Sequence, residues 1–237
     1  MKQTPSQSGT EITSIHTMLD VEGVIDAQQH AFGSHGFLRA LEGSATIANF
    51  KRFAPRVAAF VLCFQDVLRL VQTCSSEPSI KSMARIHALE DSGHDRWYLN
   101  DLQRLGISLS VSWLFSEEHR LTRDVAYRQL SLVLCAKHDQ TRLSVALALE
   151  AIGSECFGRA IGLLERIGAA EGLEYFARRH QAIEQGHQVF ETEAQNQLAS
   201  IAVPAEAREE VLHAILSTFN GMAELLDDLE HAFNAQD

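Results

Sequence analysis

Residues 176–187 read FARRHQAIEQGH, in which polar and apolar residues recur at helical spacing. At the spacing of an α-helix, its residues His180, Glu184 and His187 lie on one face. Apolar residues run beside that face and place it at the edge of a core, where an unpaired carboxylate is costly and a bound cation offsets the cost. The stretch therefore predicts a bundle helix that carries metal ligands. The alternative is a surface helix whose His and Glu side chains contact each other one turn apart.

A second stretch, residues 87–98, reads HALEDSGHDRWY. Treated as one helix, it places His87, Asp91 and His94 on one face, with Glu90 one turn before His94. Imidazole nitrogens and carboxylate oxygens together suit iron or manganese better than a thiolate set would. The stretch therefore supplies a second group of candidate ligands, beside the alternative of a polar, solvated helix face.

Between these two stretches, a single acid interrupts a run of apolar and small residues. Glu150 shares a helix face with such residues, so a ligand role explains its position better than contact with solvent does. Glu155 differs, because Arg159 one turn later offers it an ordinary surface ion pair. We therefore predict that Glu150 binds metal and that Glu155 does not.

Hydrophobic residues recur at helical spacing along almost the whole chain, and successive runs of strict alternation, typical of strands, are not found. The composition, with 46% hydrophobic residues and only 4 Pro, allows long helices. We predict one all-α domain over residues 1–237, a bundle of about seven to eight helices with a flexible extension at residues 1–10. Facing helices of such a bundle can hold two metal ions between them. The predicted helices cover approximately residues 11–32, 37–42, 47–74, 78–105, 117–137, 139–167, 170–201 and 204–233.

The formal net charge of -11 argues against broad contacts with nucleic acid or an anionic membrane and favours a small-molecule substrate. No apolar run approaches the ~18 residues of a membrane span, and the N-terminus is polar, which indicates a cytoplasmic protein. The 4 cysteines are scattered without CxxC spacing, so we expect free thiols rather than disulfides or a zinc site. Whether the chain forms a homodimer stays open.

Taken together, these features resemble the heme-oxygenase-like diiron oxidase superfamily, whose members are often described as iron-containing redox enzymes. The resemblance covers most of the chain and implies the fold shared by thiaminase II and the pyrroloquinoline quinone synthase. The chlamydial death-domain-associated protein is a relative in this superfamily. The resemblance is carried by HGFLRAL at 35–41, EDSGHDRWYLNDL at 90–102, the isolated Glu150, and the His-x3-acid-x2-His pattern at 180–187.

The same resemblance implies a set of metal ligands, completed by an acid from the helix of His94. In the chlamydial relative that acid stands seven residues before the histidine, where this chain has His87. Other members take it from nearer positions, which favours Asp91 or Glu90, so the choice among the three residues stays open. The last acid of the pattern is usually Asp in the family and is Glu here. The other implied ligands are His94, Glu150, His180, Glu184 and His187.

The implied cofactor is a pair of Fe2+ ions, or an iron and a manganese ion, with O2 as co-substrate. The implied reaction is the oxidation of a small amine, amino acid or fatty acid in a biosynthetic pathway. We expect the substrate pocket to lie between Phe60 and Phe64 and the metal-binding helices. Asp95 or Tyr98 is expected to orient the ligands.

Other functions stay open beside this one. A metal-free enzyme of the same fold would be a hydrolase like thiaminase II, with Cys135 or Cys156 as nucleophile, or an oxidase like the pyrroloquinoline quinone synthase. In a heme oxygenase, one histidine would hold the heme iron. A helical interaction protein without enzymatic activity is the remaining class. The metal content of the purified protein separates these functions.

Overall fold

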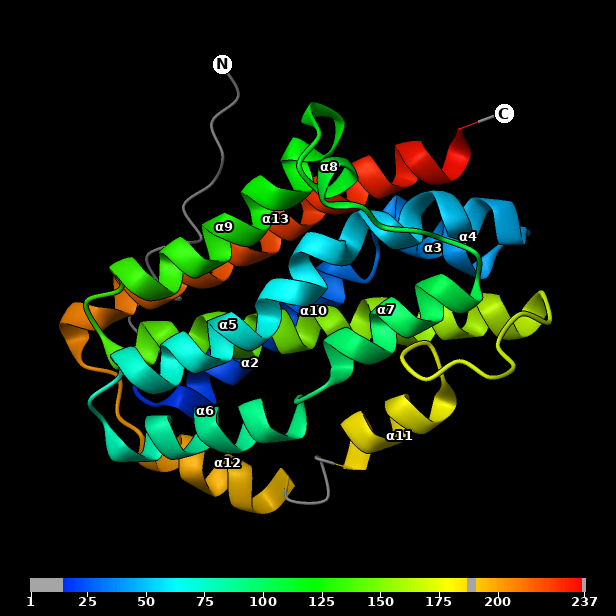
Figure 1. Ribbon diagram of the computed structural model, residues 1–237. Coiled ribbons are helices and arrows are strands. Elements are labelled where there is room, and N and C mark those ends of the chain that lie inside the picture. The colour runs from blue at the N-terminus through cyan, green and yellow to red at the C-terminus, as the bar shows by residue number, and fades with distance from the viewer. Residues whose placement is uncertain (1–14, 187–190, 236–237) are drawn as a thin grey trace.

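The computed structural model describes residues 15–186 and 191–235, and its regular structure is helical (Figure 1). Within these residues no strand forms, and a single antiparallel bridge joins Thr17 to Ala202. The all-α prediction is confirmed, with more helices than expected because several predicted helices are interrupted. In chain order the helices are α2 (Met18–Phe32), α3 (Gly36–Glu42), α4 (Ile47–Phe53), α5 (Ala58–Cys74), α6 (Pro78–Glu90), α7 (His94–Arg104), α8 (Val111–Leu114), α9 (Arg120–Cys135), α10 (Asp139–Arg166), α11 (Arg178–Gly186), α12 (Glu191–Ser200) and α13 (Arg208–Asn234).

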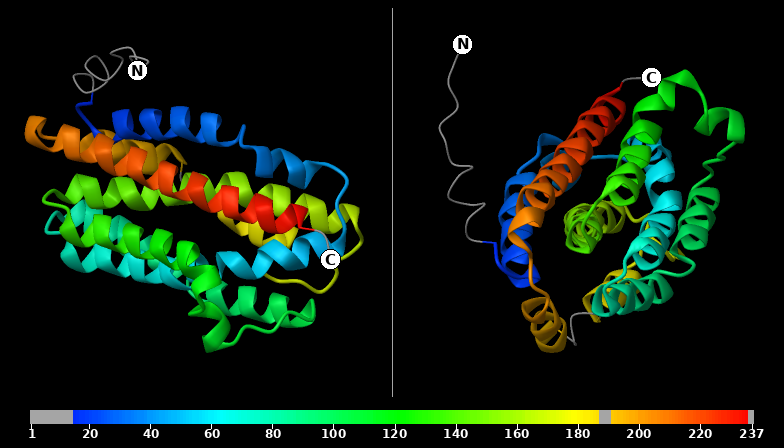
Figure 2. Two further views of the ribbon diagram at one scale, coloured as in Figure 1. Left: turned by 90° about the horizontal axis from the view of Figure 1, so that it is seen from above. Right: turned by 90° about the vertical axis from the view of Figure 1, so that its left-hand side faces the viewer.

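Helix α10 lies at the centre, and α2, α13, α9 and α5 surround it (Figure 2). Its buried residues point to several sides of the helix, which is typical of a helix that other helices surround within a bundle. The side chain of Glu150, which belongs to this helix, is therefore attached near the centre of the bundle. The buried residues of α10 include Leu143, Val145, Ala146, Ala148, Leu149, Ile152, Ala160, Ile161, Leu163 and Leu164.

Edge-to-face phenylalanine contacts join α3, α4 and α13 at one end of the bundle. The Phe37 ring lies 5.1 Å from the Phe53 ring and 6.0 Å from the Phe233 ring, both nearly perpendicular. Such pairs add to the free energy of burial because the positive ring edge meets the negative ring face. These contacts anchor the two chain ends of the fold to each other.

The start of α2 is defined by its cap. The Thr17 side chain accepts a hydrogen bond from the Asp20 backbone, and the Asp20 carboxylate accepts one from the Thr17 backbone, forming a capping box. The helix therefore begins at Met18, inside the range 11–32 that the sequence predicts, whose residues 11–14 lie outside the described part of the chain.

The predicted helix 78–105 is interrupted, so its predicted continuity was wrong. Helix α6 ends at Glu90, α7 begins at His94, and Gly93 between them has a φ of 100°. This left-handed conformation is open to glycine but sterically costly for other residues. His87 and His94 therefore belong to different helices and do not share one helical stripe.

The predicted helix 170–201 also begins later than expected, at Arg178. Turns occupy much of residues 167–177, in which Gly168 and Gly172 have φ angles of 67° and 76°. Left-handed glycines of this kind terminate helices. The chain thus loops back before α11 instead of running straight into it.

The predicted helix 47–74 is divided into α4 and α5 by a 3-10 turn at Ala54–Val57, which contains Pro55. Taken as one stretch, Ile47–Cys74 is long and apolar enough to cross a membrane, so the expectation that no segment has this property was wrong. Core helices of soluble proteins also meet this criterion. Helix α5 packs against α6, α9 and α10, and that packing accounts for its apolar face.

The backbone at Gly93 provides a direct test of the break between α6 and α7. We expect Gly93→Ala to lower the free energy of unfolding by about 1–2 kcal/mol, because alanine resists the left-handed conformation. A Cβ at this position meets no atom within 4 Å, so the cost comes from the backbone alone. Urea denaturation measures it.

Gly23→Ala is the matched control for that substitution. Gly23 lies inside α2, and an added Cβ there also meets nothing within 4 Å. Alanine in a helix interior is expected to raise stability by about 0.5–1 kcal/mol. If both substitutions stabilise the protein, the left-handed turn at Gly93 does not exist in solution.

Candidate metal centre

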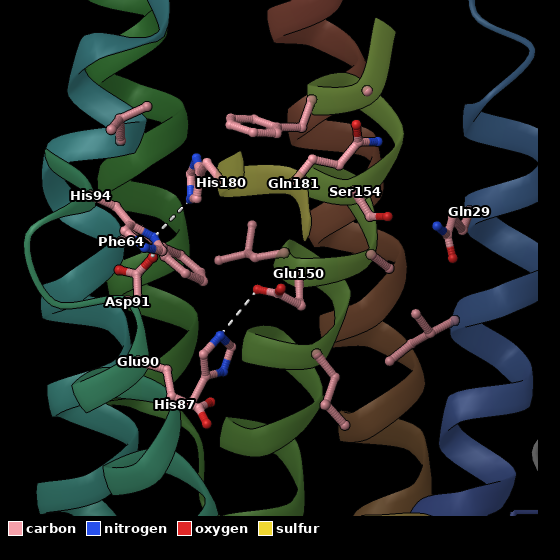
Figure 3. A pocket seen from close by; sticks show the side chains of 18 of the residues that line it. Gln29, Phe64, His87, Glu90, Asp91, His94, Glu150, Ser154, His180 and Gln181 are labelled. Atoms are coloured by element: carbon pink, nitrogen blue, oxygen red, sulfur yellow. Dashed lines mark hydrogen bonds and ion pairs between the residues drawn. The ribbon is translucent and has the colours of Figure 1, made fainter. Parts of the chain in front are cut away.

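A cavity of about 460 Å³ opens between α2, α5, α6, α10 and α11. All the predicted ligands whose side chains the structure describes line it, and they come from α6 and its C-cap, α7, α10 and α11 (Figure 3). The expected position next to Phe60 and Phe64 agrees with the structure, because both rings also line this cavity. The ligand candidates in the lining are His87, Glu90, Asp91, His94, Glu150 and His180.

Asp91, His94 and His180 form one contact group in this cavity (Figure 3). Nδ1 of His94 lies 2.8 Å from Oδ1 of Asp91 and 3.1 Å from Nε2 of His180. The turn at Gly93 produces the first contact, since it folds the C-cap residue of α6 against the first residue of α7. Both imidazoles are buried. A helix break and a distant helix thus bring two nitrogen donors and one carboxylate together.

The backbone sets the tautomer of His180. Its Nδ1 lies 2.8 Å from the carbonyl oxygen of Tyr175, and a carbonyl only accepts hydrogen bonds, so Nδ1 carries the proton. In the neutral tautomer with this proton, Nε2 carries the lone pair, and here Nε2 lies 3.1 Å from Nδ1 of His94. This is the form in which an imidazole binds a metal ion.

Gln65 on α5 holds the carboxylate of Asp91 from the other side. Its amide Nε2 donates to Oδ2 of Asp91 at 2.6 Å and lies 3.3 Å from the carbonyl oxygen of Ala88. Gln65 is itself buried, so few other orientations are open to it. The Asp91 carboxylate is therefore fixed through both of its oxygens, one by His94 and one by Gln65.

Glu150 and His87 form a second pair in the same cavity. Oε2 of Glu150 lies 3.1 Å from Nε2 of His87, and the Phe64 ring meets the His87 ring edge-on at 5.8 Å. The Glu150 side chain is 42% exposed, because it faces the cavity rather than the packed core. Glu150 of α10 and His87 of α6 therefore meet in this cavity.

Aromatic rings enclose His180 and His94. The centroids of Phe157, Tyr175 and Trp97 lie 4.6, 5.0 and 5.4 Å from that of His180, and Trp97 lies 4.8 Å from His94. Such rings keep water away from the imidazoles and lower the local dielectric constant, which strengthens the electrostatic contacts among them.

The remaining sequence predictions have different outcomes. Glu90 lines the cavity but is exposed. The Glu184 side chain and the whole of His187 lie outside the described residues, although α11 includes position 184. Glu155 pairs with Arg159 as predicted.

Among residues 15–186 and 191–235, no group of three His, Cys, Asp or Glu side chains is arranged to hold a metal ion, so the complete ligand set stays a prediction.

Tyr98 does not orient the ligands in the way that the sequence suggested. Its ring is completely buried, and its hydroxyl donates to the carbonyl oxygen of Ala54 at 2.7 Å, so it ties α7 to the turn after α4. Burial raises its pKa well above the ordinary value. Asp95 lies near the start of α7 and does not line the cavity.

Asp101 is a residue of the site region that the sequence did not single out. Its side chain is fully buried on α7 and accepts backbone hydrogen bonds from Glu174, at 2.8 and 3.1 Å, and from Phe176, at 2.9 Å. Burial raises its pKa, while these bonds and Arg104 act in the opposite direction. Since Tyr175 stands between the two bonded residues, Asp101 fixes the carbonyl that orients His180. The only signal in the sequence is an acid one turn after Tyr98 on the buried face of α7.

One comparison with known proteins gives a match. Residues 51–220, more than half of the chain, match a protein family described as an iron-containing redox enzyme. The matched range includes every cavity-lining residue named above from α5, α6, α10 and α11. No curated protein matches the chain.

The loop held by Asp101 leads to a stability prediction. Asp101→Ala leaves backbone N–H groups buried without a partner, so we expect a loss of about 1–3 kcal/mol in the free energy of unfolding. Asp124→Ala, which removes an exposed acid paired with Arg120 at 3.6 Å, is the control. It should change stability by less than about 0.5 kcal/mol. Equal effects in denaturant titrations would contradict the assigned role of Asp101.

Proposed function

This chain belongs to the family of iron-containing redox enzymes, within the heme-oxygenase-like superfamily, and it is therefore an oxidoreductase of all-α fold. From this premise we propose that it is a non-heme diiron oxidase, which uses dioxygen to oxidise a small metabolite in a biosynthetic pathway. The observation that carries the proposal is the convergence of Asp91, His94 and His180 from separate helices in one cavity. The pair of Glu150 and His87 in the same cavity supports it.

The donor set fits iron. The cavity offers imidazole nitrogens and carboxylate oxygens, and no cysteine among the described residues lines it. Iron and manganese accept such mixed sets, whereas zinc and copper(I) sites often use thiolates. His94, His180 and Asp91 would hold one ion, and Glu150 would serve the other, with Glu184 and His187 completing the set. When bound, the two ions would supply the electrons with which dioxygen is activated.

The chain's own residues prepare the site for these ions. The carbonyl oxygen of Tyr175 keeps the proton on Nδ1 of His180, so Nε2 is ready to bind without a change of tautomer. Gln65 keeps the Asp91 carboxylate in place from behind. The rings of Trp97 and Phe157 exclude water from the imidazoles, which protects reactive species from side reactions.

The thiols give little support to a metal-free hydrolase with a cysteine nucleophile. Burial raises the pKa of the Cys156 thiol to about 12, so the reactive thiolate is scarce near neutral pH. Cys135 lines a separate pocket with Arg128 and His213 and does not face the main cavity. The iron site therefore explains the arrangement of side chains better.

Metal reconstitution tests the proposal. After anaerobic incubation with ferrous iron, we expect about two ions per chain by elemental analysis, because the ligand-bearing helices offer more donors than one ion uses. His180→Ala should lose about one of these ions while the helical circular dichroism signal stays near wild type. Glu155→Ala, an acid held by Arg159, should load iron normally. An apo protein that takes up no iron, or one zinc ion only, would refute the diiron site.

Two adjacent acids test which carboxylate completes the set. Asp91 contacts His94 and Gln65, whereas Glu90 is exposed at the end of α6. We expect Asp91→Ala to lower iron affinity by about 10–100-fold, the range typical of residues that bind or orient a metal ligand. Glu90→Ala, measured in the same competition titration with a chelator, should change it less than about threefold. The reverse order would assign the carboxylate to Glu90.

A further inference from the structure

The cavity has a second wall, which the proposed ligands do not use. Helix α2 contributes Glu22, Ile25, Asp26 and Gln29 to the lining. Gln29 projects from α2 on the side of the cavity opposite His94 (Figure 3). A molecule bound in the cavity would therefore have the metal-binding wall on one side and the polar residues of α2 on the other.

The charges around the cavity are of one sign. Carboxylates come from both walls, whereas no Lys or Arg is among the described residues of the lining. The described acids of the lining are Glu22, Asp26, Glu90, Asp91 and Glu150.

This charge pattern selects among the substrate classes. A carboxylate substrate, such as a fatty acid, would enter a site without a basic side chain and would face acids of its own charge, which raises the free energy of binding. An ammonium group would instead form ion pairs with these acids, which lowers the free energy of binding. Two ferrous ions would bring four positive charges, of which the proposed ligand carboxylates of Asp91, Glu150 and Glu184 would offset three, and Glu22 and Asp26 on α2 add two further negative charges.

The space between the walls suits an apolar body. Phe60, Val61 and Phe64 from α5 and Phe157 from α10 line it, and the Phe60 and Phe64 rings lie 6.0 Å apart. Aromatic faces pack against flat apolar groups and attract cations. The volume of about 460 Å³ is within the range of pockets for small molecules.

We infer that the substrate is a small organic cation, an amine whose ammonium group lies against Glu22 and Asp26 and whose apolar body lies between the phenylalanine rings. The inference deepens the proposed function, since it names the substrate class of the same cavity. Asp26 and Glu22, one helical turn apart on α2, are then specificity-determining residues. The position of the charge on the wall opposite the histidines directs the rest of the molecule toward the metal ions.

Three probes that share one phenyl ring test this inference: 2-phenylethylammonium, 3-phenylpropanoate and 2-phenylethanol. Isothermal titration calorimetry is carried out under argon, on the ferrous protein and on the metal-free protein. We expect the ammonium probe to bind the ferrous protein at least about tenfold more tightly than either of the others, which corresponds to about 1.4 kcal/mol. Its affinity should fall as salt is added, because the ion pairs are partly exposed.

The α2 acids are tested by substitution. Asp26→Asn and Glu22→Gln should each weaken binding of the ammonium probe by about three- to tenfold and leave 2-phenylethanol unaffected. Asp66→Asn is the matched control, because Asp66 is an exposed acid on α5 that does not line the cavity. This variant should bind all three probes as the wild type does.

The outcomes separate this inference from the proposed function. Preference for 3-phenylpropanoate, or an ammonium affinity that neither α2 variant changes, would overturn the inference even if the protein loads two iron ions. A protein that takes up no iron but prefers the ammonium probe through Asp26 would refute the diiron site and keep the inference. Because both the ferrous and the metal-free protein are titrated, each result tests either the inferred substrate class or the diiron site.

Discussion

The hydrogen bond from Nδ1 of His180 to the carbonyl oxygen of Tyr175 is the contact on which the site depends. It determines which ring nitrogen has a lone pair, and therefore whether His180 meets His94 as an acceptor or as a donor. The carbonyl is held in turn by the buried carboxylate of Asp101, which accepts hydrogen bonds from the residues on either side of Tyr175. Burying a carboxylate is costly, and these N–H donors offset that cost. The loop before α11 is thus a rigid support for a buried imidazole, although it lacks regular structure.

The second constraint is the left-handed turn at Gly93. A continuous helix would have carried His94 along the axis of α6, one turn beyond Asp91, whereas here His94 is the first residue of α7 and contacts both Asp91 and His180. The break lets α7 take its own direction, while the C-cap carboxylate of α6 stays in contact with the first residue of α7. Two donors only three residues apart in sequence therefore approach the cavity from different helices.

Much of the fold was predictable because helical periodicity is a strong local signal, and the apolar run of α10 and the caps of α2 lie in the sequence itself. The interruptions of the predicted helices could not be predicted from the sequence. Glycine is tolerated in helices and ends them only where tertiary packing favours a left-handed turn. Of the site, the histidines and Glu150 were predictable as polar residues in apolar surroundings. Asp101 was not, since its partners lie 73 and 75 residues away and are backbone groups without a residue-type signature. Gln65 was missed for a similar reason, because its partner Asp91 lies on another helix.

The acids that line the cavity come from two sides of it, which separates the proposed metal site from the inferred substrate site. Asp91 and Glu150 each face an imidazole, so their charge is already directed toward the histidine side of the cavity. Metal ions bound there would be neutralised mainly by these nearest carboxylates, because Coulomb energy falls with distance and rises in a water-poor site. Glu22 and Asp26 line the cavity from α2, a helix that carries none of those ligands. If all the acids stood on the histidine wall, a cationic substrate would compete with the metal ions for the same carboxylates. For the proposed diiron site and the inferred amine substrate, separate walls would remove that competition.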